Sequence, residues 1–312
     1  MVLGVDTSCY RTSLALADGE EILAETGRLL DVPAGERGLR QSEALFQHVK
    51  RLPELLEAMM ARARAAEPVG AVAVSVKPRP MEDSYMPVFT AGASVARSIA
   101  SALRVPLIET THQQGHVRAA LVGCDLPADF LAVHLSGGTT EVLKVGGGLS
   151  IDRLGGTADI SAGQLVDRVG VTLGLSFPAG PHLEALAVKG EARSALPVSV
   201  SNLTCSLSGA EAALMRLIEA GAGAENIAAE VYSLIARTLA RLISQAASQT
   251  GLQDVLLAGG VASSALLRAL LPERLTRLNR DIRVHWARPE LSGDNAVGVA
   301  LIGCDRLKGE CS

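Results

Sequence analysis

The chain of 312 residues is 48% apolar and 20% charged, which is typical of a globular protein with a substantial core, and its length favours two domains. Its net charge of −4 and aromatic content of 3% argue against a protein that binds nucleic acid unaided, because such proteins usually carry a basic excess or stacking aromatics. No apolar run approaches the ~18 residues that a membrane span needs.

The cysteines and the N-terminal residues predict a compartment. Five cysteines lie far apart and form no CxxC pair, which favours a reduced protein. Residues Met1–Asp6 enter an apolar strand at once, without a basic flank or a cleavage-like site. We therefore expect no signal peptide, no membrane association and a cytoplasmic location.

A strand–turn–strand pattern opens the chain and occurs a second time near its middle. Leu3–Ser8 aligns with Leu131–Ser136, and Thr12 aligns with Thr140. Each copy then turns at glycine and enters a third apolar run. Two such units predict a duplicated α/β fold of the actin, sugar-kinase and Hsp70 class, with two RNase H-like domains and a cleft between them. In that class, nucleotide phosphates lie between the two hairpins.

The rest of the first half alternates helices and strands. The spacing of apolar residues predicts a helix over Gln41–Met60, in which Pro53 marks a kink or break. Ala71–Val76 is a buried strand, and residues 88–103 form a helix rich in small residues. The intervening loop, 77–87, contains three prolines and is either a functional loop or a surface excursion.

A pair of histidines follows the next predicted strand, residues 105–109. Thr111 is a plausible N-cap, so the helix would open at His112. The i,i+4 spacing of His112 and His116 places both imidazoles on one helical face, as a metal site needs. A pair of surface or core histidines would show the same spacing.

The second hairpin carries Ser136-Gly137-Gly138 at its turn. The glycines can take a positive φ and have no Cβ, so their N–H groups could approach a polyanion closely. Such a turn also serves merely to connect two strands. A predicted helix that includes Asp159, Gly163 and Asp167 follows.

Further helices are predicted at residues 207–220, 225–249 and 266–278. Between the last two, the strand Val255–Ala258 is followed by Gly259-Gly260. A strand followed by a glycine pair and then a helix is a common nucleotide-binding arrangement. Six arginines between residues 268 and 288 indicate either a solvated helix face or a nucleic-acid patch. Near the end, Asp294 could cap the last helix or supply a metal ligand.

Together these motifs resemble the TsaD (Gcp) family of tRNA adenosine threonylcarbamoyltransferases over essentially the whole chain, and more distantly HypF and antibiotic carbamoyltransferases. The motifs that carry the resemblance, in chain order, are Asp6-Thr7-Ser8-Cys9, His112-x-x-Gly115-His116, Ser136-Gly137-Gly138, Asp159-x-x-Ala162-Gly163-x-x-x-Asp167, Pro178-Ala179-Gly180-Pro181, Ser206-Leu207-Ser208-Gly209, Ala258-Gly259-Gly260-Val261 and Asp294-Asn295.

The resemblance implies a role for each part of the chain. An N-terminal lobe, residues 1–127, would carry the histidine pair, and a C-terminal lobe, residues 128–312, would carry the nucleotide contacts and the metal aspartate. The implied metal ligands are His112, His116 and Asp294, a set that suits Fe(II) and would also accept Zn²⁺ or Mg²⁺. The implied contacts of an adenine nucleotide or threonylcarbamoyl-AMP are Ser136, Gly137 and Gly138 to phosphate, Asp167 and Gly180 to ribose, and Gly259, Gly260 and Ser264 around adenine.

The chain departs from the family pattern at several positions. Where the family continues its first motif with an Asp thought to assist catalysis, this chain has Tyr10, whose phenol is a poor base at neutral pH. Lys77-Pro78-Arg79-Pro80 and an insertion replace a Gly-Pro-Gly-Leu loop, and Thr139 and Ser264 replace a His and an Asn. No catalytic residue is therefore assigned.

Three functions follow as hypotheses. The first is transfer of threonylcarbamoyl from threonylcarbamoyl-AMP to the adenosine beside the anticodon of tRNA, with TsaB- and TsaE-like partner subunits and a homo- or heterodimer. The second is a non-catalytic paralogue that binds metal and nucleotide and scaffolds or regulates that assembly, as the loss at Tyr10 would permit. The third is a small-molecule carbamoyltransferase, as the altered 77–87 loop would permit.

Overall fold

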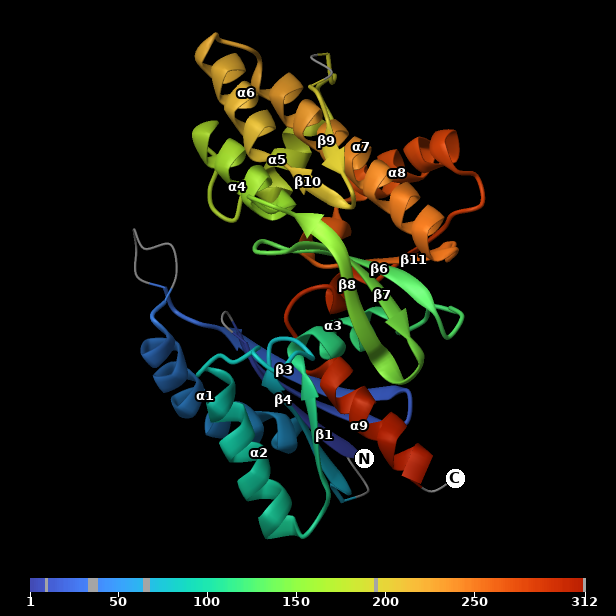
Figure 1. Ribbon diagram of the computed structural model, residues 1–312. Coiled ribbons are helices and arrows are strands. Elements are labelled where there is room, and N and C mark those ends of the chain that lie inside the picture. The colour runs from blue at the N-terminus through green and yellow to red at the C-terminus, as the bar shows by residue number, and fades with distance from the viewer. Residues whose placement is uncertain (9–10, 33–38, 64–67, 194–195, 311–312) are drawn as a thin grey trace. The chain divides into compact units, whose positions relative to one another are not determined.

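The computed structural model describes residues 1–8, 11–32, 39–63, 68–193 and 196–310. The chain forms two compact units: one contains residues 1–122 and the segment that begins at Gly293, and the other contains residues 123–292 (Figure 1). This division differs from the expected lobes because the C-terminal segment, which carries Asp294, belongs to the first unit. Its last helix packs on the first sheet, as described below.

The first unit is built on a five-stranded sheet with the order β3-β2-β1-β4-β5. β1 pairs antiparallel with β2, and β2 with β3, whereas β1–β4 and β4–β5 are parallel. The strands are β1 (Val2–Thr7), β2 (Arg11–Asp18), β3 (Glu21–Leu29), β4 (Ala71–Lys77) and β5 (Leu107–Thr111). The first strand–turn–strand pattern of the sequence therefore forms the hairpin that was predicted.

Helices cover both faces of this sheet (Figure 1). They are α1 (Gln41–Arg62), α2 (Phe89–Leu103), α3 (His112–Ala120) and α9 (Val297–Glu310). Leu3 and Val5 of β1 join the apolar core formed with α1 and α2. The alternate residue Gly4 faces α9, where a Cβ would lie 2.7 Å from the Ala300 nitrogen. β1 is consequently buried along its whole length, as strands covered on both faces are.

The sequence predicts a kink or a break at Pro53, and because α1 runs without interruption through this residue, the break is wrong. Proline cannot donate to the carbonyl four residues earlier, which here belongs to Val49. Pro53 and Val49 are both exposed, so water can satisfy that carbonyl. The missing hydrogen bond therefore costs little free energy, and packing of the buried face keeps α1 helical through Pro53.

The second unit contains a seven-stranded sheet with the order β12-β11-β6-β7-β8-β10-β9. The strands are β6 (Phe130–Leu135), β7 (Thr140–Gly146), β8 (Ser150–Thr157), β9 (Ser199–Ser201), β10 (Thr204–Ser206), β11 (Asp254–Ala258) and β12 (Arg283–Trp286). The run β8-β7-β6-β11-β12 repeats the order and the strand directions of β3-β2-β1-β4-β5. This repeat confirms the duplicated α/β fold.

Helices and short turns complete the second unit, and its core gathers around the long helix α7. The elements are η1 (Gly147–Leu149), α4 (Ala162–Thr172), α5 (Gly180–Ala187), α6 (Ser208–Glu219), α7 (Ala224–Thr250), η2 (Gly260–Ser263), α8 (Ala265–Leu278) and η3 (Pro289–Leu291). α6, α7 and α8 match the predicted helices closely. α5 and the short strands β9, β10 and β12 were not predicted. None of the described helices combines the length and apolar character that crossing a bilayer requires.

Asp159 lies before α4 rather than inside it, so that part of the helix prediction is wrong. Ser161 is the N-cap of α4, and its side chain accepts from the Gln164 N–H. The Asp159 carboxylate instead accepts from the Leu207 and Ser208 N–H groups at the start of α6. Although burial opposes ionisation, these hydrogen bonds lower the pKa of Asp159 far below its usual range.

Candidate metal centre and nucleotide-binding loops

The helix α3 begins where β5 ends, and its cap fixes the position of the first histidine. The Thr111 hydroxyl accepts from the Gln114 N–H at 3.2 Å, and the Gln114 side chain accepts from the Thr111 N–H at 3.2 Å. This reciprocal pair is a capping box, which holds the first helical turn firmly. His112 is therefore the first helical residue, and His116 follows one turn later on the same face, as predicted.

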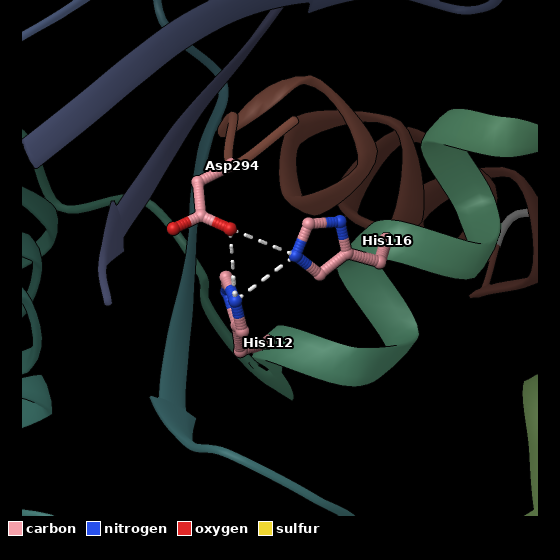
Figure 2. Close-up of side chains that lie close together, drawn as sticks. All are labelled: His112, His116 and Asp294. Carbon is pink, nitrogen blue, oxygen red and sulfur yellow. Dashed lines mark hydrogen bonds and ion pairs between the residues drawn. The ribbon is translucent and has the colours of Figure 1, made fainter. Parts of the chain in front are cut away.

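Asp294 reaches the same place from the C-terminal segment of the first unit. α9 lies directly against α3, because Gly298 has no side chain to separate them. The Asn295 side chain accepts from the Val297 N–H at the start of α9. Asp294 is consequently not needed as a cap, and its carboxylate turns toward the two histidines (Figure 2).

The three side chains place three ligand atoms around one point. His112 Nε2 and His116 Nε2 are 3.0 Å apart, and Asp294 Oδ1 lies 3.6 Å from the first and 3.2 Å from the second. Ligands about 2.1 Å from a divalent ion lie about 3.0 Å apart at adjacent octahedral corners and about 3.4 Å apart in a tetrahedron. The spacing and the donor types therefore fit a site that could hold a metal ion. Among the described residues, these three side chains form the one group with such a geometry.

The charges of the cluster depend on one another. Burial lowers the pKa of His112, but the Asp6 and Asp294 carboxylates more than offset this and raise it well above its usual value. Burial raises the pKa of Asp294, but its hydrogen bonds to His112 and His116 outweigh burial and hold it well below the usual range. Without a metal, the site thus favours a cationic His112 beside an anionic Asp294.

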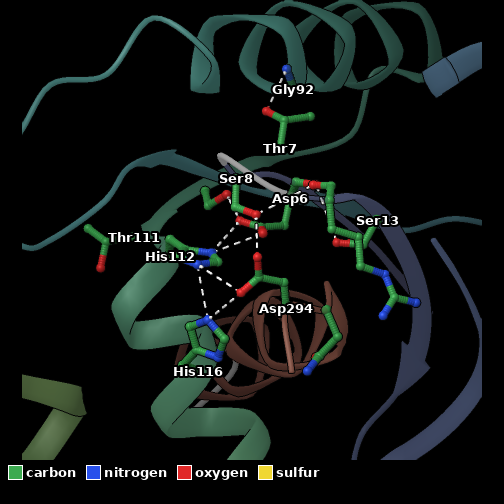
Figure 3. A network of polar contacts seen from close by, with 12 residues as sticks. Asp6, Thr7, Ser8, Ser13, Gly92, Thr111, His112, His116 and Asp294 are labelled. Atoms are coloured by element: carbon green, nitrogen blue, oxygen red, sulfur yellow. Dashed lines mark hydrogen bonds and ion pairs between the residues drawn. The ribbon is translucent and has the colours of Figure 1, made fainter. Parts of the chain in front are cut away.

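Asp6 and Ser8, at the end of β1, contact two residues of this cluster (Figure 3), and Ser75 of β4 contacts Asp6. Asp6 Oδ1 and Oδ2 lie 3.1 and 3.0 Å from His112 Nδ1. The Ser75 hydroxyl donates to Asp6 Oδ1, and the Ser8 hydroxyl donates to Asp294 Oδ2 at 2.8 Å. Sequence reasoning assigned no role to these three residues, although a buried acid at the end of an apolar strand could have signalled one.

The turn between β1 and β2 is tied at both ends by a histidine that the sequence analysis did not single out. The fully buried His48 of α1 lies 2.8 Å from the Ser8 carbonyl oxygen through Nε2 and 2.8 Å from the Thr12 hydroxyl through Nδ1. Tyr10, at the position of the family aspartate, is outside the described residues, so the loss of a base at that position stays an expectation.

The proline-rich loop adjoins the histidine helix. The Gln113 N–H donates to the Pro78 carbonyl at 2.9 Å, and the Lys77 ammonium donates to the Met81 carbonyl at 3.0 Å. At the other end of the loop, the Thr7 hydroxyl donates to the Val88 carbonyl. The segment is thus fastened to the framework of the candidate metal centre.

In the second unit, the turn after β6, the start of α4 and the turn after β11 meet at the end of β6. A Cβ on Gly163 would lie 2.5 Å from the Ser136 carbonyl oxygen, and one on Gly259, where φ is +100°, would lie 2.2 Å from the Leu135 carbonyl oxygen. Gly137 and Gly138 are different, because both are exposed and a Cβ on either would meet no atom within 4 Å. Packing therefore explains Gly163 and Gly259 but not this glycine pair.

A tyrosine that sequence reasoning missed joins two other predicted nucleotide contacts. The Tyr232 hydroxyl of α7 donates to the Gly180 carbonyl at 3.1 Å and is also hydrogen-bonded to the Ser264 side chain. Asp167 Oδ1 accepts from the Ala179 N–H at 2.8 Å, and burial raises the pKa of this carboxyl. The apolar spacing of this helix predicts that position 232 is buried but gives no sign of these two contacts.

Three of the six arginines between residues 268 and 288 make local contacts. Arg268 donates to the carbonyls of Ala262 and Ala287, at 3.0 and 2.7 Å, and so fastens the turn that follows β11. Arg277 pairs with Glu273, and Arg283 pairs with Asp254. These contacts support the solvated-face interpretation over a nucleic-acid patch.

Comparison with known proteins identifies the family. The model of the family described as "TsaD: tRNA N6-adenosine threonylcarbamoyltransferase" matches residues 32–301. The chain belongs to the TsaD family. Proteins named tRNA N6-adenosine threonylcarbamoyltransferase from Methylobacillus flagellatus and Aromatoleum aromaticum are 30% and 31% identical to it, over 99% and 98% of this chain and 93% and 91% of theirs.

Solved structures extend the likeness of this TsaD family member at the level of the fold. HypF of T. kodakarensis superposes with a TM-score of 0.65 at 17% identity, over 99% of this chain and 48% of HypF. The activator of 2-hydroxyisocaproyl-CoA dehydratase from Clostridium difficile, with bound ADPNP, superposes with a TM-score of 0.54 at 16% identity, over 99% and 96% of the two chains. These proteins and the ROK sugar kinases share the actin-like fold that was predicted.

Proposed function

We propose that this chain is an acyltransferase that moves the threonylcarbamoyl group of threonylcarbamoyl-AMP to the adenosine beside the anticodon of tRNA. The observation that carries the proposal is membership of the TsaD family over nearly the whole chain, whose named relatives bear that activity. The His-His-Asp cluster supports it, because a transferase of this kind needs a group that can polarise a carbonyl.

His112, His116 and Asp294 would hold one divalent metal. Two imidazoles and one carboxylate with open positions suit Fe(II), and Zn²⁺ or Mg²⁺ would also find acceptable ligands. When bound, the ion supplies Lewis-acid polarisation of the carbamoyl carbonyl and a positive charge for the phosphate. The two imidazoles must present unprotonated Nε2 atoms, so metal binding displaces the proton that the raised pKa of His112 favours.

The second unit would bind the adenylate. The exposed amides of Gly137 and Gly138, with Ser136, would contact the phosphate, and the absence of any packing reason for these glycines supports that role. Asp167 and Gly180 would hold the ribose. The turn formed by Gly259, Gly260 and Ser264 would flank adenine, with its backbone held in place by Arg268.

Partner subunits would contribute to the binding of tRNA. The net charge of −4 gives the chain no overall attraction for a polyanion, and Arg277 and Arg283 are each paired with an acid. TsaB- and TsaE-like subunits, by analogy with the family, would supply the remaining contacts.

The decisive experiment is a transfer assay with purified full-length protein, threonylcarbamoyl-AMP and tRNA, read as modified adenosine by mass spectrometry. We expect metal-dependent transfer that is lost in His116→Ala and Asp294→Asn and kept in Asp152→Asn, a control at an exposed carboxylate of β8. Retained transfer in both ligand variants would overturn the metal assignment.

The same assay separates the alternatives. Turnover of the adenylate without tRNA would point to a small-molecule carbamoyltransferase. Nucleotide binding without transfer, even after TsaB- and TsaE-like subunits are added, would point to a scaffold.

A further inference from the structure

We propose that Asp6 is a positioning residue that fixes the ring of His112 so that Nε2 keeps its lone pair for a metal ion. The inference deepens the proposed function and rests on its metal centre. It concerns a side chain that would not itself touch the metal.

The geometry of the pair determines which nitrogen carries the proton. Asp6 is fully buried at the end of β1, and both of its carboxylate oxygens lie within 3.1 Å of His112 Nδ1. An ionised carboxylate can only accept hydrogen bonds, so this contact requires a proton on Nδ1. In a neutral imidazole, Nε2 is then unprotonated, and Nε2 is the atom that faces His116 and Asp294.

The carboxylate is itself held in place. The Ser75 hydroxyl of the neighbouring strand β4 donates to Asp6 Oδ1, and β1 and β4 pair in parallel up to Val5 and Val74. The Ser13 hydroxyl donates at 3.3 Å to the Asp6 backbone carbonyl rather than to the carboxylate, so it does not set the direction of the carboxylate. Because strand pairing sets the distance between Asp6 and Ser75, the carboxylate has a fixed direction before any ligand arrives.

Ser8, two residues after Asp6, orients the carboxylate ligand Asp294 in a similar way. The Ser8 hydroxyl donates to Asp294 Oδ2 at 2.8 Å, which leaves Oδ1 directed at the two histidines (Figure 3). One short segment, Asp6–Ser8, thus orients both an imidazole ligand and the carboxylate ligand. Outer partners of this kind typically change metal affinity by roughly 10- to 100-fold when they are removed.

Asp6→Asn is the sharpest variant, because it keeps the shape of the side chain. Its amide NH₂ can donate to His112 Nδ1, which stabilises the tautomer with the proton on Nε2, where the metal should bind. We expect roughly 10- to 100-fold weaker metal binding in Asp6→Asn and a smaller loss in Ser8→Ala. Ser13→Ala is the matched control, since it removes a buried hydroxyl bonded to Asp6 but leaves the carboxylate in place.

The test is calorimetric titration of the metal-free, full-length proteins with Zn²⁺ and with Fe(II) under anaerobic conditions. Weaker metal binding by Asp6→Asn, with an unchanged affinity in Ser13→Ala, supports the inference. Equal affinity in the wild type and Asp6→Asn overturns it while leaving the proposed function standing. If the wild type binds neither ion, the proposed metal centre fails and the inference fails with it.

A second measurement needs no variant at position 6. Long-range ¹H–¹⁵N correlation of histidine-labelled, metal-free wild type, at a pH where the spectrum shows a neutral His112 ring, reports the tautomer directly. The His112 signal, assigned by its loss in His112→Gln, should show the proton on Nδ1. A proton on Nε2 would overturn the inference even if Asp6→Asn does not fold.

Discussion

Gly298 of α9 lies against Gly115 of α3 so closely that a Cβ on Gly298 would fall 1.8 Å from the Gly115 carbonyl oxygen. Gly115 stands between the two histidines in the sequence, and Gly298 stands four residues after Asp294. The contact therefore sets the distance between the helix that carries two candidate ligands and the segment that carries the third.

Gly298→Ala should consequently weaken metal binding as well as the fold. The methyl group must push α9 away from α3, at a cost of about 1–3 kcal/mol in the free energy of unfolding. The matched control is Gly309→Ala on the same helix, where a Cβ meets no atom within 4 Å and should stabilise by about 0.5–1 kcal/mol. Urea denaturation and metal titration of both variants check this, and equal behaviour would refute it.

His48 should make the stability of the first unit depend on pH. Its Nε2–H must donate to the Ser8 carbonyl, so Nδ1 accepts from the Thr12 hydroxyl and the neutral ring is required. Burial lowers the pKa of His48, and Arg51 adds to this, while the Ser8 carbonyl and Asp6 oppose it. The unfolded chain therefore takes up a proton first as the pH falls.

The contribution of His48 to the free energy of unfolding should thus be largest above pH 6.5, the unperturbed pKa of histidine. It should decline as the pH falls from there to the lowered pKa of His48 in the folded protein. The slope cannot exceed about 1.4 kcal/mol per pH unit, the equivalent of one proton. The measurement is the difference between the unfolding profiles of wild type and His48→Gln, which cannot be protonated. A difference that is flat across this window would count against the buried neutral ring.

Gly163→Ala should impair nucleotide binding without touching the nucleotide. Its Cβ would collide with the Ser136 carbonyl and the Gly137 Cα, 2.5 and 2.6 Å away, and displace the proposed phosphate turn. We expect the affinity for a fluorescent adenine nucleotide to fall roughly tenfold or more, equivalent to about 1.4 kcal/mol. Gly147→Ala, in an open turn of the same sheet, should bind normally.

Tyr232→Phe should loosen the two turns that its hydroxyl joins. Removing the hydroxyl deprives the Gly180 carbonyl and the Ser264 side chain of a partner, which costs about 1–3 kcal/mol where the groups are buried. The loss should appear in thermal unfolding, and saturating adenine nucleotide should restore part of it if Gly180 and Ser264 contact the ligand. An unchanged melting temperature would show that the hydroxyl does not link the turns.

Local chemistry explains what could be predicted from the sequence. The strand–turn–strand pattern, the Thr111 cap and the shared face of His112 and His116 depend only on neighbouring residues, and the structure shows all three. Most helices were found for the same reason, since their apolar spacing is a local property. The resemblance added Asp294, which spacing alone left as either a cap or a ligand.

The rest depended on contacts between distant residues. Asp6 and His112 are 106 positions apart, and no pattern near either one reports that they meet. Asp294 and Asn295 are equally good caps by residue type, and only the fold gave the cap to Asn295. The packing of α9 in the first unit also depends on distant residues, Gly4 and Gly298. A side chain at either position would collide with the neighbouring element.

The return of the C-terminal segment to the first unit has a consequence for biosynthesis. His116 and Asp294 are separated by 178 positions, so the whole second unit is synthesised before the third candidate ligand is added. The nascent first unit can hold a metal only weakly, with two imidazoles, until that segment arrives. Tight metal binding would thus follow the synthesis of both units, and a bound ion would link α3 to the segment that carries Asp294.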